Sequence, residues 1–174
     1  SVRLWRDIPF CRPPGDNAPW HYDLTWEPLA TDRLVAVWIA LNDIAPDMGP
    51  LTFASGTHRS PRYDVVSPDR AEQRGFTQKL EGLGHRMVDY APMRPGDASV
   101  HFGWTMHSAR PNTSALRREA ISIFFFPDGT RIAVPPTPEK DRDAHWQRVQ
   151  AFQMATRLGG KPGARVAAKG RSKR

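Results

Sequence analysis

The sequence has only one cysteine, Cys11, among its 174 residues, so the chain cannot form an internal disulfide. A reducing compartment, and hence a cytoplasmic protein, is the simpler expectation. No apolar run approaches the roughly 20 residues that a membrane-spanning helix requires. The N-terminus also lacks the basic and then apolar pattern of a secretion signal. We therefore expect a protein that has no membrane partner.

Acidic residues are absent from the end of the chain, where every charge from Lys161 onward is basic. This pattern predicts that residues 159–174 form a disordered, solvated tail. A nucleic-acid contact is the alternative, but no aromatic residue is interleaved with these charges, which disfavours it. The net charge of +7 instead favours an anionic small-molecule substrate.

Helical patterns are scarce, whereas 17 prolines and 13 glycines punctuate the chain. Such punctuation favours short strands joined by turns over a helix bundle. A chain of this length, with 39% hydrophobic residues, suits a single domain, which we place at residues 1–158. Extended chain is predicted over residues 20–26, and strands over residues 33–42, 51–54, 86–91, 98–107 and 119–126.

The remaining segments are predicted to be irregular, except for one late helix. Residues 1–19 contain several prolines and residues 60–75 are polar, so neither stretch is expected to be regular. Thr137 and Pro138 resemble a helix start, and apolar residues then recur on one face as far as Leu158. Together these elements predict an all-β double-sheet jelly roll or barrel, with a C-terminal helix packed outside.

Two of the predicted strands, at residues 34–41 and 118–126, share one pattern. Along each strand, bulky aliphatic residues alternate with small residues that accompany a large polar or aromatic group. Because side chains alternate across a strand, each has a bulky face and a small-residue face. We expect the bulky faces to pack as core and the small-residue faces to leave room for a ligand. Ordinary size variation within a core is the alternative.

His21 and Asp23 lie two residues apart on a predicted strand, so both side chains should project from one face. His107, which ends a later strand, is the candidate for a third metal ligand. Two histidines and one carboxylate leave three positions open on an octahedral ion, which suits Fe(II), a chelating co-substrate and O₂. Alone, the His-x-Asp pattern is weak, because a hydrogen-bonded surface pair would look the same.

Several motifs in register give this pattern more weight. Residues 19–23 read Pro-Trp-His-Tyr-Asp, and residues 37–43 read Val-Trp-Ile-Ala-Leu-Asn-Asp, followed by Ser-Gly-Thr-His-Arg at 55–59. Pro-Gly-Asp-Ala at 95–98 precedes His107 and then Asn-Thr-Ser at 112–114. In order and spacing, residues 12–128 resemble the phytanoyl-CoA dioxygenase family of Fe(II)/2-oxoglutarate oxygenases.

The resemblance implies a double-stranded β-helix fold with His21, Asp23 and His107 as iron ligands. It implies that Arg118 pairs with the distal carboxylate of 2-oxoglutarate and that Trp38 lines the co-substrate pocket. A guanidinium can form two hydrogen bonds with a carboxylate and remains charged when buried. Arg118 lies on the small-residue face, whereas Arg117 would point the opposite way and is the second choice. For Trp38, a plain core role is the alternative.

The implied activity is that of a 2-oxoglutarate-dependent dioxygenase, which hydroxylates a small molecule and releases succinate and CO₂. Zn²⁺-dependent hydrolysis by the same triad is one alternative. A non-catalytic β-barrel binding module, or an inactive fragment of such an oxygenase, is another. Only twenty residues precede His21, and the first is Ser1. Family members usually carry a longer segment there, so we expect either a trimmed chain or an unusually open pocket.

Overall fold

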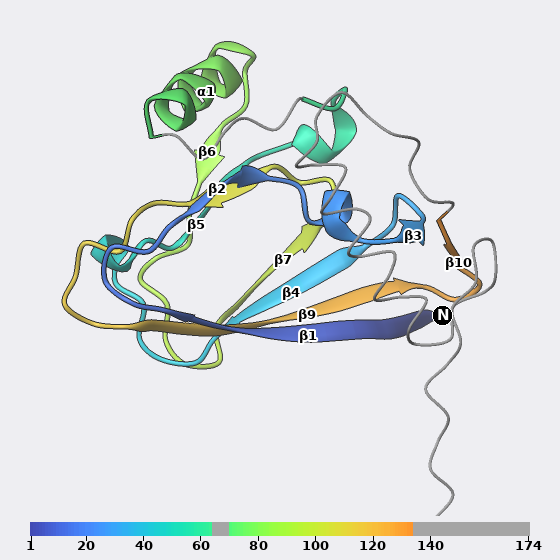
Figure 1. Ribbon diagram of the computed structural model, residues 1–174, viewed down its shortest axis with the longest axis horizontal. Coiled ribbons are helices and arrows are strands. Elements are labelled where there is room, and N and C mark those ends of the chain that lie inside the picture. Colours follow the sequence, from blue (N-terminus) through green and yellow to red (C-terminus); the bar gives the residue numbers. More distant parts are fainter. Residues whose placement is uncertain (64–69, 134–174) are drawn as a thin grey trace, which may run out of the picture.

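The computed structural model describes residues 1–63 and 70–133. Two four-stranded antiparallel sheets face each other, with strand orders β1-β9-β4-β7 and β2-β8-β5-β6, and β3 pairs with β10 at one end (Figure 1). The strands are β1 (Val2–Arg12), β2 (Ala18–His21), β3 (Leu29–Ala30), β4 (Val35–Ala40), β5 (Leu51–Ala54), β6 (Met87–Val88), β7 (Ala98–Phe102), β8 (His107–Ala109), β9 (Arg118–Pro127) and β10 (Arg131–Ile132). The helical elements are the 3₁₀ turns η1 (Asp23–Trp26), η2 (Pro46–Met48) and η3 (Thr57–Arg59) and the helix α1 (Arg70–Gly82).

The chain passes repeatedly between the two sheets. β1, β4, β7 and β9 belong to one sheet, whereas β2, β5, β6 and β8 belong to the other. This alternation is the double-stranded β-helix, or jelly roll, and it confirms the predicted fold class. The predicted late helix and tail, and with them the domain boundary at residue 158, lie outside the described residues.

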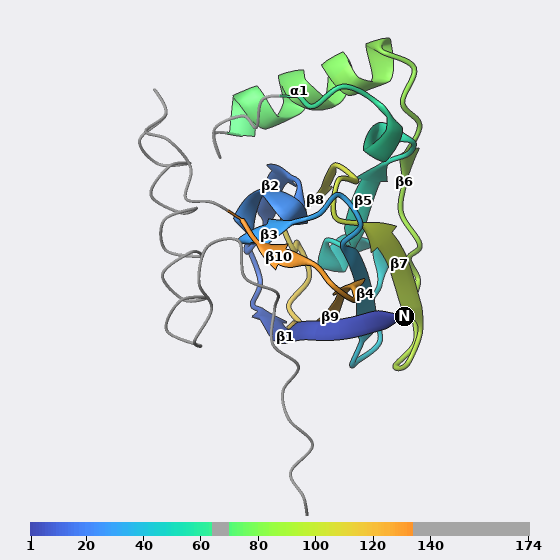
Figure 2. The same cartoon turned by 90° about the vertical axis from the view of Figure 1, so that its right-hand side faces the viewer.

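Helix α1 lies on the outer side of the β2-β8-β5-β6 sheet (Figures 1 and 2). The prediction of a loop over residues 60–75 is therefore wrong from Arg70 onward. Phe76 and Leu80, one helical turn apart, bury their side chains against Trp20. The Trp20 indole also donates a hydrogen bond to Thr77 Oγ1 at 2.9 Å. Neither α1 nor any shorter helix in the described part of the chain has the length and apolarity to cross a bilayer.

The prediction that residues 1–19 are irregular is also wrong, because β1 pairs with β9 from Val2 to Arg12. The prolines that suggested irregular structure, Pro13, Pro14 and Pro19, lie beyond the end of β1, and the strand itself contains only Pro9. A strand at the edge of a sheet tolerates proline, however, because its outward N–H groups need no ladder partner. β1 is such an edge strand. The predicted strand at residues 86–91 shrinks to β6.

The bulky faces of β4 and β9 were expected to pack as core, but the structure turns their other faces inward. Ala36, Trp38 and Ala40 are buried, so the small-residue face does point into the molecule. The bulky face is only half-buried, and on the neighbouring strand β7, Val100 and Phe102 are 67% and 48% exposed. The expectation that the bulky faces form the core is therefore wrong. The core lies between the sheets, where small residues make space for larger polar groups.

The predicted strand at residues 98–107 is in fact two strands, β7 and β8, in different sheets. Gly103 lies between them, and its N–H donates to the Leu34 carbonyl at 2.8 Å. A β-carbon on Gly103 would lie 2.9 Å from both Leu24 Cδ1 and Leu34 Cβ, so the close approach favours glycine. The chain thus crosses from one sheet to the other and delivers His107 to the strand beside β2.

Candidate active site

Sheet pairing brings the two predicted histidine ligands together. His21 is the last residue of β2 and His107 the first of β8, and the two are register partners. Their ring centroids are 4.2 Å apart, with the ring planes inclined by 51°. Two residues that are 86 positions apart in sequence therefore present their imidazoles side by side on the inner face of one sheet.

Asp23 lies close to the two histidines, but a turn places it there and not the predicted strand. It is the first residue of the turn η1, not part of a strand, so strand alternation does not explain its direction. The N–H of the next residue, Leu24, donates to the Gly103 carbonyl at 3.0 Å, which ties the turn to the β7–β8 crossing. Asp23 Oδ1 lies 3.9 Å from His21 Nε2 and 3.7 Å from His107 Nε2. The ligand atoms of the three residues all lie within 4.8 Å of one another, so they could hold one metal ion.

Backbone carbonyls orient both imidazoles for metal binding. His21 Nδ1 lies 2.7 Å from the Pro19 carbonyl, and His107 Nδ1 lies 3.0 Å from the Thr105 carbonyl. A carbonyl oxygen can only accept, so each Nδ1 carries the hydrogen and donates it. Each Nε2 then keeps its lone pair on the side of Asp23. This is the tautomer that a histidine metal ligand needs.

Burial and charge set the protonation of this cluster. Burial, together with the neighbouring His21, lowers the pKa of His107 to about 3, so its imidazole is neutral at physiological pH. For Asp23, burial alone would raise the pKa of the carboxyl. The proximity of His107 and the hydrogen bond from His101 outweigh burial and hold that pKa well below its ordinary value. The centre therefore offers an anionic carboxylate and the neutral imidazole of His107 beside His21, and two histidines with one carboxylate are the set that Fe(II) oxygenase sites use.

Arg118 is a buried cation with unsatisfied hydrogen-bonding groups. It lies on the inner face of β9, is 4% exposed, and its guanidinium carbon lies 5.9 Å from the Trp38 ring centroid. Its Nε and Nη1 have no hydrogen-bond partner among the described residues. Burial, with a contribution from Arg12, lowers the pKa of Arg118 to about 10, which still leaves it charged at neutral pH. Such a group calls for an anionic ligand, because a buried charge without partners is costly.

The second choice for that role, Arg117, points the other way. It is exposed, and its Nη1 donates to Cys11 Sγ at 3.3 Å on the outer face of the sheet. Strand alternation thus separates the two adjacent arginines, as expected. Arg118 and Trp38, unlike Arg117, lie between the sheets with the metal-ligand candidates.

A third histidine, His101, also reaches the candidate metal centre. On β7, it is 7% exposed, and its Nε2 lies 2.9 Å from Asp23 Oδ2. Its ring centroid is 4.6 Å from that of His107. His101 and His107 lie on strands of different sheets, so only the fold brings them together, and no sequence signal shows that His101 bonds to Asp23.

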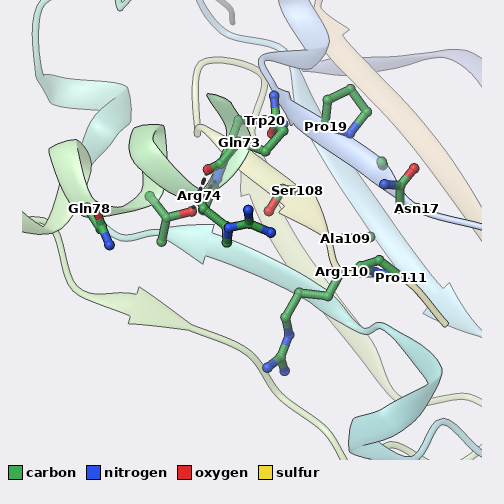
Figure 3. Close-up of a pocket in the computed structure, with 12 residues that line it drawn as sticks. Asn17, Pro19, Trp20, Gln73, Arg74, Gln78, Ser108, Ala109, Arg110 and Pro111 are labelled. Carbon is green, nitrogen blue, oxygen red and sulfur yellow. Dashed lines mark hydrogen bonds between the residues drawn. The ribbon is translucent and has the colours of Figure 1, made fainter. Parts of the chain in front are cut away.

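A cavity of about 490 Å³ lies elsewhere, between α1 and the β2–β8 strand pair (Figure 3). Trp20 and Ser108 line it, and along their strands these residues alternate with His21 and His107. None of the three metal-ligand candidates lines this cavity. Helix α1, which covers the outer side of this sheet, forms one wall of the cavity, so the cavity lies on that outer side.

Comparisons with known proteins show what the chain as a whole resembles. Residues 2–120 match the family model described as phytanoyl-CoA dioxygenase (PhyH). A curated protein of Stutzerimonas stutzeri, named a probable alpha-ketoglutarate-dependent hypophosphite dioxygenase, is 24% identical over 130 residues. That match covers 71% of this chain and 44% of the bacterial protein.

Solved structures share the fold. The epimerase SnoN from nogalamycin biosynthesis, in a complex with Fe³⁺, alpha-ketoglutarate and nogalamycin RO, has a TM-score of 0.67 at 19% identity, covering 97% of this chain and 63% of SnoN. EvdO2 from Micromonospora carbonacea var. aurantiaca, in a complex with 2-oxoglutarate, has a TM-score of 0.59 at 25% identity, covering 79% of this chain and 56% of EvdO2. The chain thus spans under half of the curated relative and about three fifths of the structural ones.

Proposed function

The chain belongs to the phytanoyl-CoA dioxygenase family, and from this membership we propose that it is an Fe(II)- and 2-oxoglutarate-dependent dioxygenase. The observation that carries the proposal is the buried guanidinium of Arg118, two of whose nitrogens have no hydrogen-bond partner in the described part of the chain, on the inner face of the fold that also holds His21, Asp23 and His107. A metal triad alone would fit several reactions. A triad with a buried cation beside it fits a metal-chelating co-substrate that ends in a carboxylate.

The side chains present fit an iron ion. His21 and His107 would bind it through Nε2, since both Nδ1 atoms are engaged with backbone carbonyls, and Asp23 would bind it through a carboxylate oxygen. Three protein ligands leave positions for a chelating co-substrate and for O₂. When bound, the iron would supply the oxidative chemistry, which consumes 2-oxoglutarate, O₂ and a substrate C–H and gives succinate, CO₂ and an alcohol.

Arg118 and Trp38 would hold the co-substrate. The guanidinium has two nitrogens without a hydrogen-bond partner among the described residues, which could donate to the distal carboxylate of 2-oxoglutarate, and its carbon lies 5.9 Å from the centroid of the Trp38 ring. Phe53 packs against His107, with ring centroids 5.8 Å apart, and so keeps water away from that ligand. These residues position the reactants and shield the reaction, and this is the part of catalysis that the protein itself supplies.

The substrate in this proposal is a small anion, and neither a nucleic acid nor a membrane is a partner. A net charge of +7 favours anionic molecules. The relative from Stutzerimonas stutzeri is named for hypophosphite, which is also a small anion. A cytoplasmic location belongs to the same proposal and rests on the single cysteine.

The test is oxygen uptake by the purified protein with Fe(II) and 2-oxoglutarate, with succinate measured in parallel by NMR. We expect slow uncoupled turnover that needs both additions, and none in the Asp23→Ala variant. Binding of 2-oxoglutarate without oxygen uptake would instead favour a non-catalytic module. Zn²⁺-dependent hydrolysis without oxygen uptake would favour a hydrolase.

A further inference from the structure

His101 connects the two sheets at the candidate metal centre. It comes from β7, whereas His21 and His107 belong to the opposite sheet. Its Nε2 lies 2.9 Å from Asp23 Oδ2, while the other carboxylate oxygen, Oδ1, is the one nearer to His21 and His107. The two oxygens of Asp23 therefore face different partners.

The direction of this hydrogen bond follows from its acceptor. An ionised carboxylate can only accept, so His101 Nε2 carries the hydrogen and donates it. In a neutral ring, Nδ1 then holds a lone pair, and it is buried without a partner in the part of the chain that the structure describes. The imidazole also packs against the Phe53 ring, at a centroid distance of 5.1 Å. An apolar ring could fill this space without burying an unsatisfied nitrogen. The advantage of an imidazole here is therefore its hydrogen bond to Asp23.

Asp23 needs an external support because of where it lies. It begins a 3₁₀ turn, so the pleat of a strand does not direct its side chain as it directs those of His21 and His107. Left alone, the carboxylate could rotate and present both oxygens to a metal. A hydrogen bond to Oδ2 restrains that rotation and leaves Oδ1 turned toward the two Nε2 atoms.

We propose that His101 is a positioning residue that makes Asp23 a one-oxygen metal ligand and so keeps a coordination position open for the co-substrate or O₂. This inference rests on the proposed function, because it assumes that Asp23 binds a metal. Hydrogen bonds to ligating carboxylates commonly tune metal sites in this way. His101 is not a fourth ligand, since its Nε2 is engaged by Asp23 and it does not belong to the cluster of three ligand atoms.

The experiment titrates Co(II) into the protein and follows the visible absorption bands, whose position and intensity report the coordination number. His101→Phe keeps a ring but removes the donor, and His101→Gln keeps a donor at a similar reach. We expect His101→Phe to bind Co(II) about 10- to 100-fold more weakly, with a spectrum shifted toward higher coordination. His101→Gln should retain the wild-type spectrum and most of the affinity.

Ser99→Ala is the matched control. Ser99 lies on the same face of β7, and its Oγ is likewise buried without a partner among the described residues, so its loss should change neither affinity nor spectrum. If His101→Phe does not fold, His101→Asn provides the contrast with Gln, because its amide is too short to reach Asp23. A donor-less variant with wild-type affinity and spectrum would overturn the inference. A wild-type protein that binds no Co(II) would instead overturn the proposed function.

Discussion

His21 and His107 are register partners across the β2–β8 pair, and their ring centroids are 4.2 Å apart. A shift of one residue in this register would turn one imidazole to the outer face of the sheet. The pairing of two short strands therefore places two ligands before any metal binds. Asp23 is the third candidate ligand and the only one of the three that carries a negative charge.

Asp23→Ala should abolish binding of a divalent metal and, with it, any 2-oxoglutarate-dependent oxygen uptake. The variant removes the one carboxylate of the three candidate ligands and leaves two imidazoles, of which burial lowers the pKa of His107 to about 3. Isothermal titration with Mn(II) or Co(II) measures the loss. Asp128→Ala, at an exposed acid paired with Arg3, is the control and should bind metal normally. Equal, mild effects from both changes would argue against Asp23 as a ligand.

Arg118→Met should weaken 2-oxoglutarate binding and at the same time stabilise the protein without ligands. A charge-assisted pair is worth about 1.5–3 kcal/mol, so the affinity should fall on the order of 10- to 100-fold. The same change removes a buried guanidinium with two nitrogens that no described residue satisfies, so the thermal midpoint of the variant should rise by a few degrees. Fluorescence titration and thermal unfolding measure the two effects.

Arg117→Met is the matched control for Arg118, because its side chain is exposed on the outer face. It should leave both the 2-oxoglutarate affinity and the thermal midpoint close to wild type. If Arg117→Met lost affinity for 2-oxoglutarate while Arg118→Met kept it, Arg117 and not Arg118 would be the residue that binds the co-substrate.

The candidate ligand set could be proposed from sequence because several motifs occur in register along the chain, and the structure brings these three side chains close together. His21 and Asp23 are two residues apart, and His107 follows a recognisable turn. The fold was predictable for a related reason, since short alternating strands between glycines and prolines leave few other architectures. The local structure at Asp23 was not predictable, because the extended residue Tyr22 can be followed by either a strand or a 3₁₀ turn.

Other features could not be predicted because they depend on tertiary contacts, which produce no pattern in the neighbouring sequence. The strand β1 contains Pro9, and only its place at the sheet edge makes that tolerable. Helix α1 is largely polar in sequence, and burial of Phe76 and Leu80 against Trp20 is what positions it. The sequence predicts that the bulky aliphatic face of β4 is core. In the structure the smaller residues of β4 face the interior, where they leave room for groups such as Arg118. Each miss reflects a partner that lies far away in sequence.

Gly49→Ala should be much more destabilising than Gly15→Ala. Both glycines have positive φ, +67° and +85°, so each substitution incurs a backbone cost of roughly 1–2 kcal/mol. At Gly15 a β-carbon would meet nothing within 4 Å, but at Gly49 it would lie 2.2 Å from the carbonyl oxygen of Arg110. This backbone clash should add roughly 1–3 kcal/mol. Urea unfolding measures the difference, and equal losses in both variants would show that the loop after β8 can move aside.

Glu27 should make stability depend on pH in an unusual direction for a carboxylate. Its side chain is only 2% exposed, and burial raises its pKa above the ordinary value of 4.5, against the opposing effects of Arg6 and of the 2.6 Å hydrogen bond from Trp5 Nε1. The folded protein therefore binds this proton more tightly than the unfolded chain does. Its contribution to stability is complete below pH 4.5 and is lost as the pH rises through the folded-state pKa.

Glu27→Gln removes this titration while keeping an acceptor for Trp5, so it isolates the effect. The free energy of unfolding of the wild type, minus that of the variant, should be larger near pH 4 than near pH 7. Urea unfolding at several pH values measures it, and the subtraction cancels the titration of all other acids. Glu81→Gln, at an exposed position on α1, is the control for the removal of one carboxylate from the chain. A difference for Glu27→Gln that grows with rising pH would mean that its attraction to Arg6 outweighs its burial.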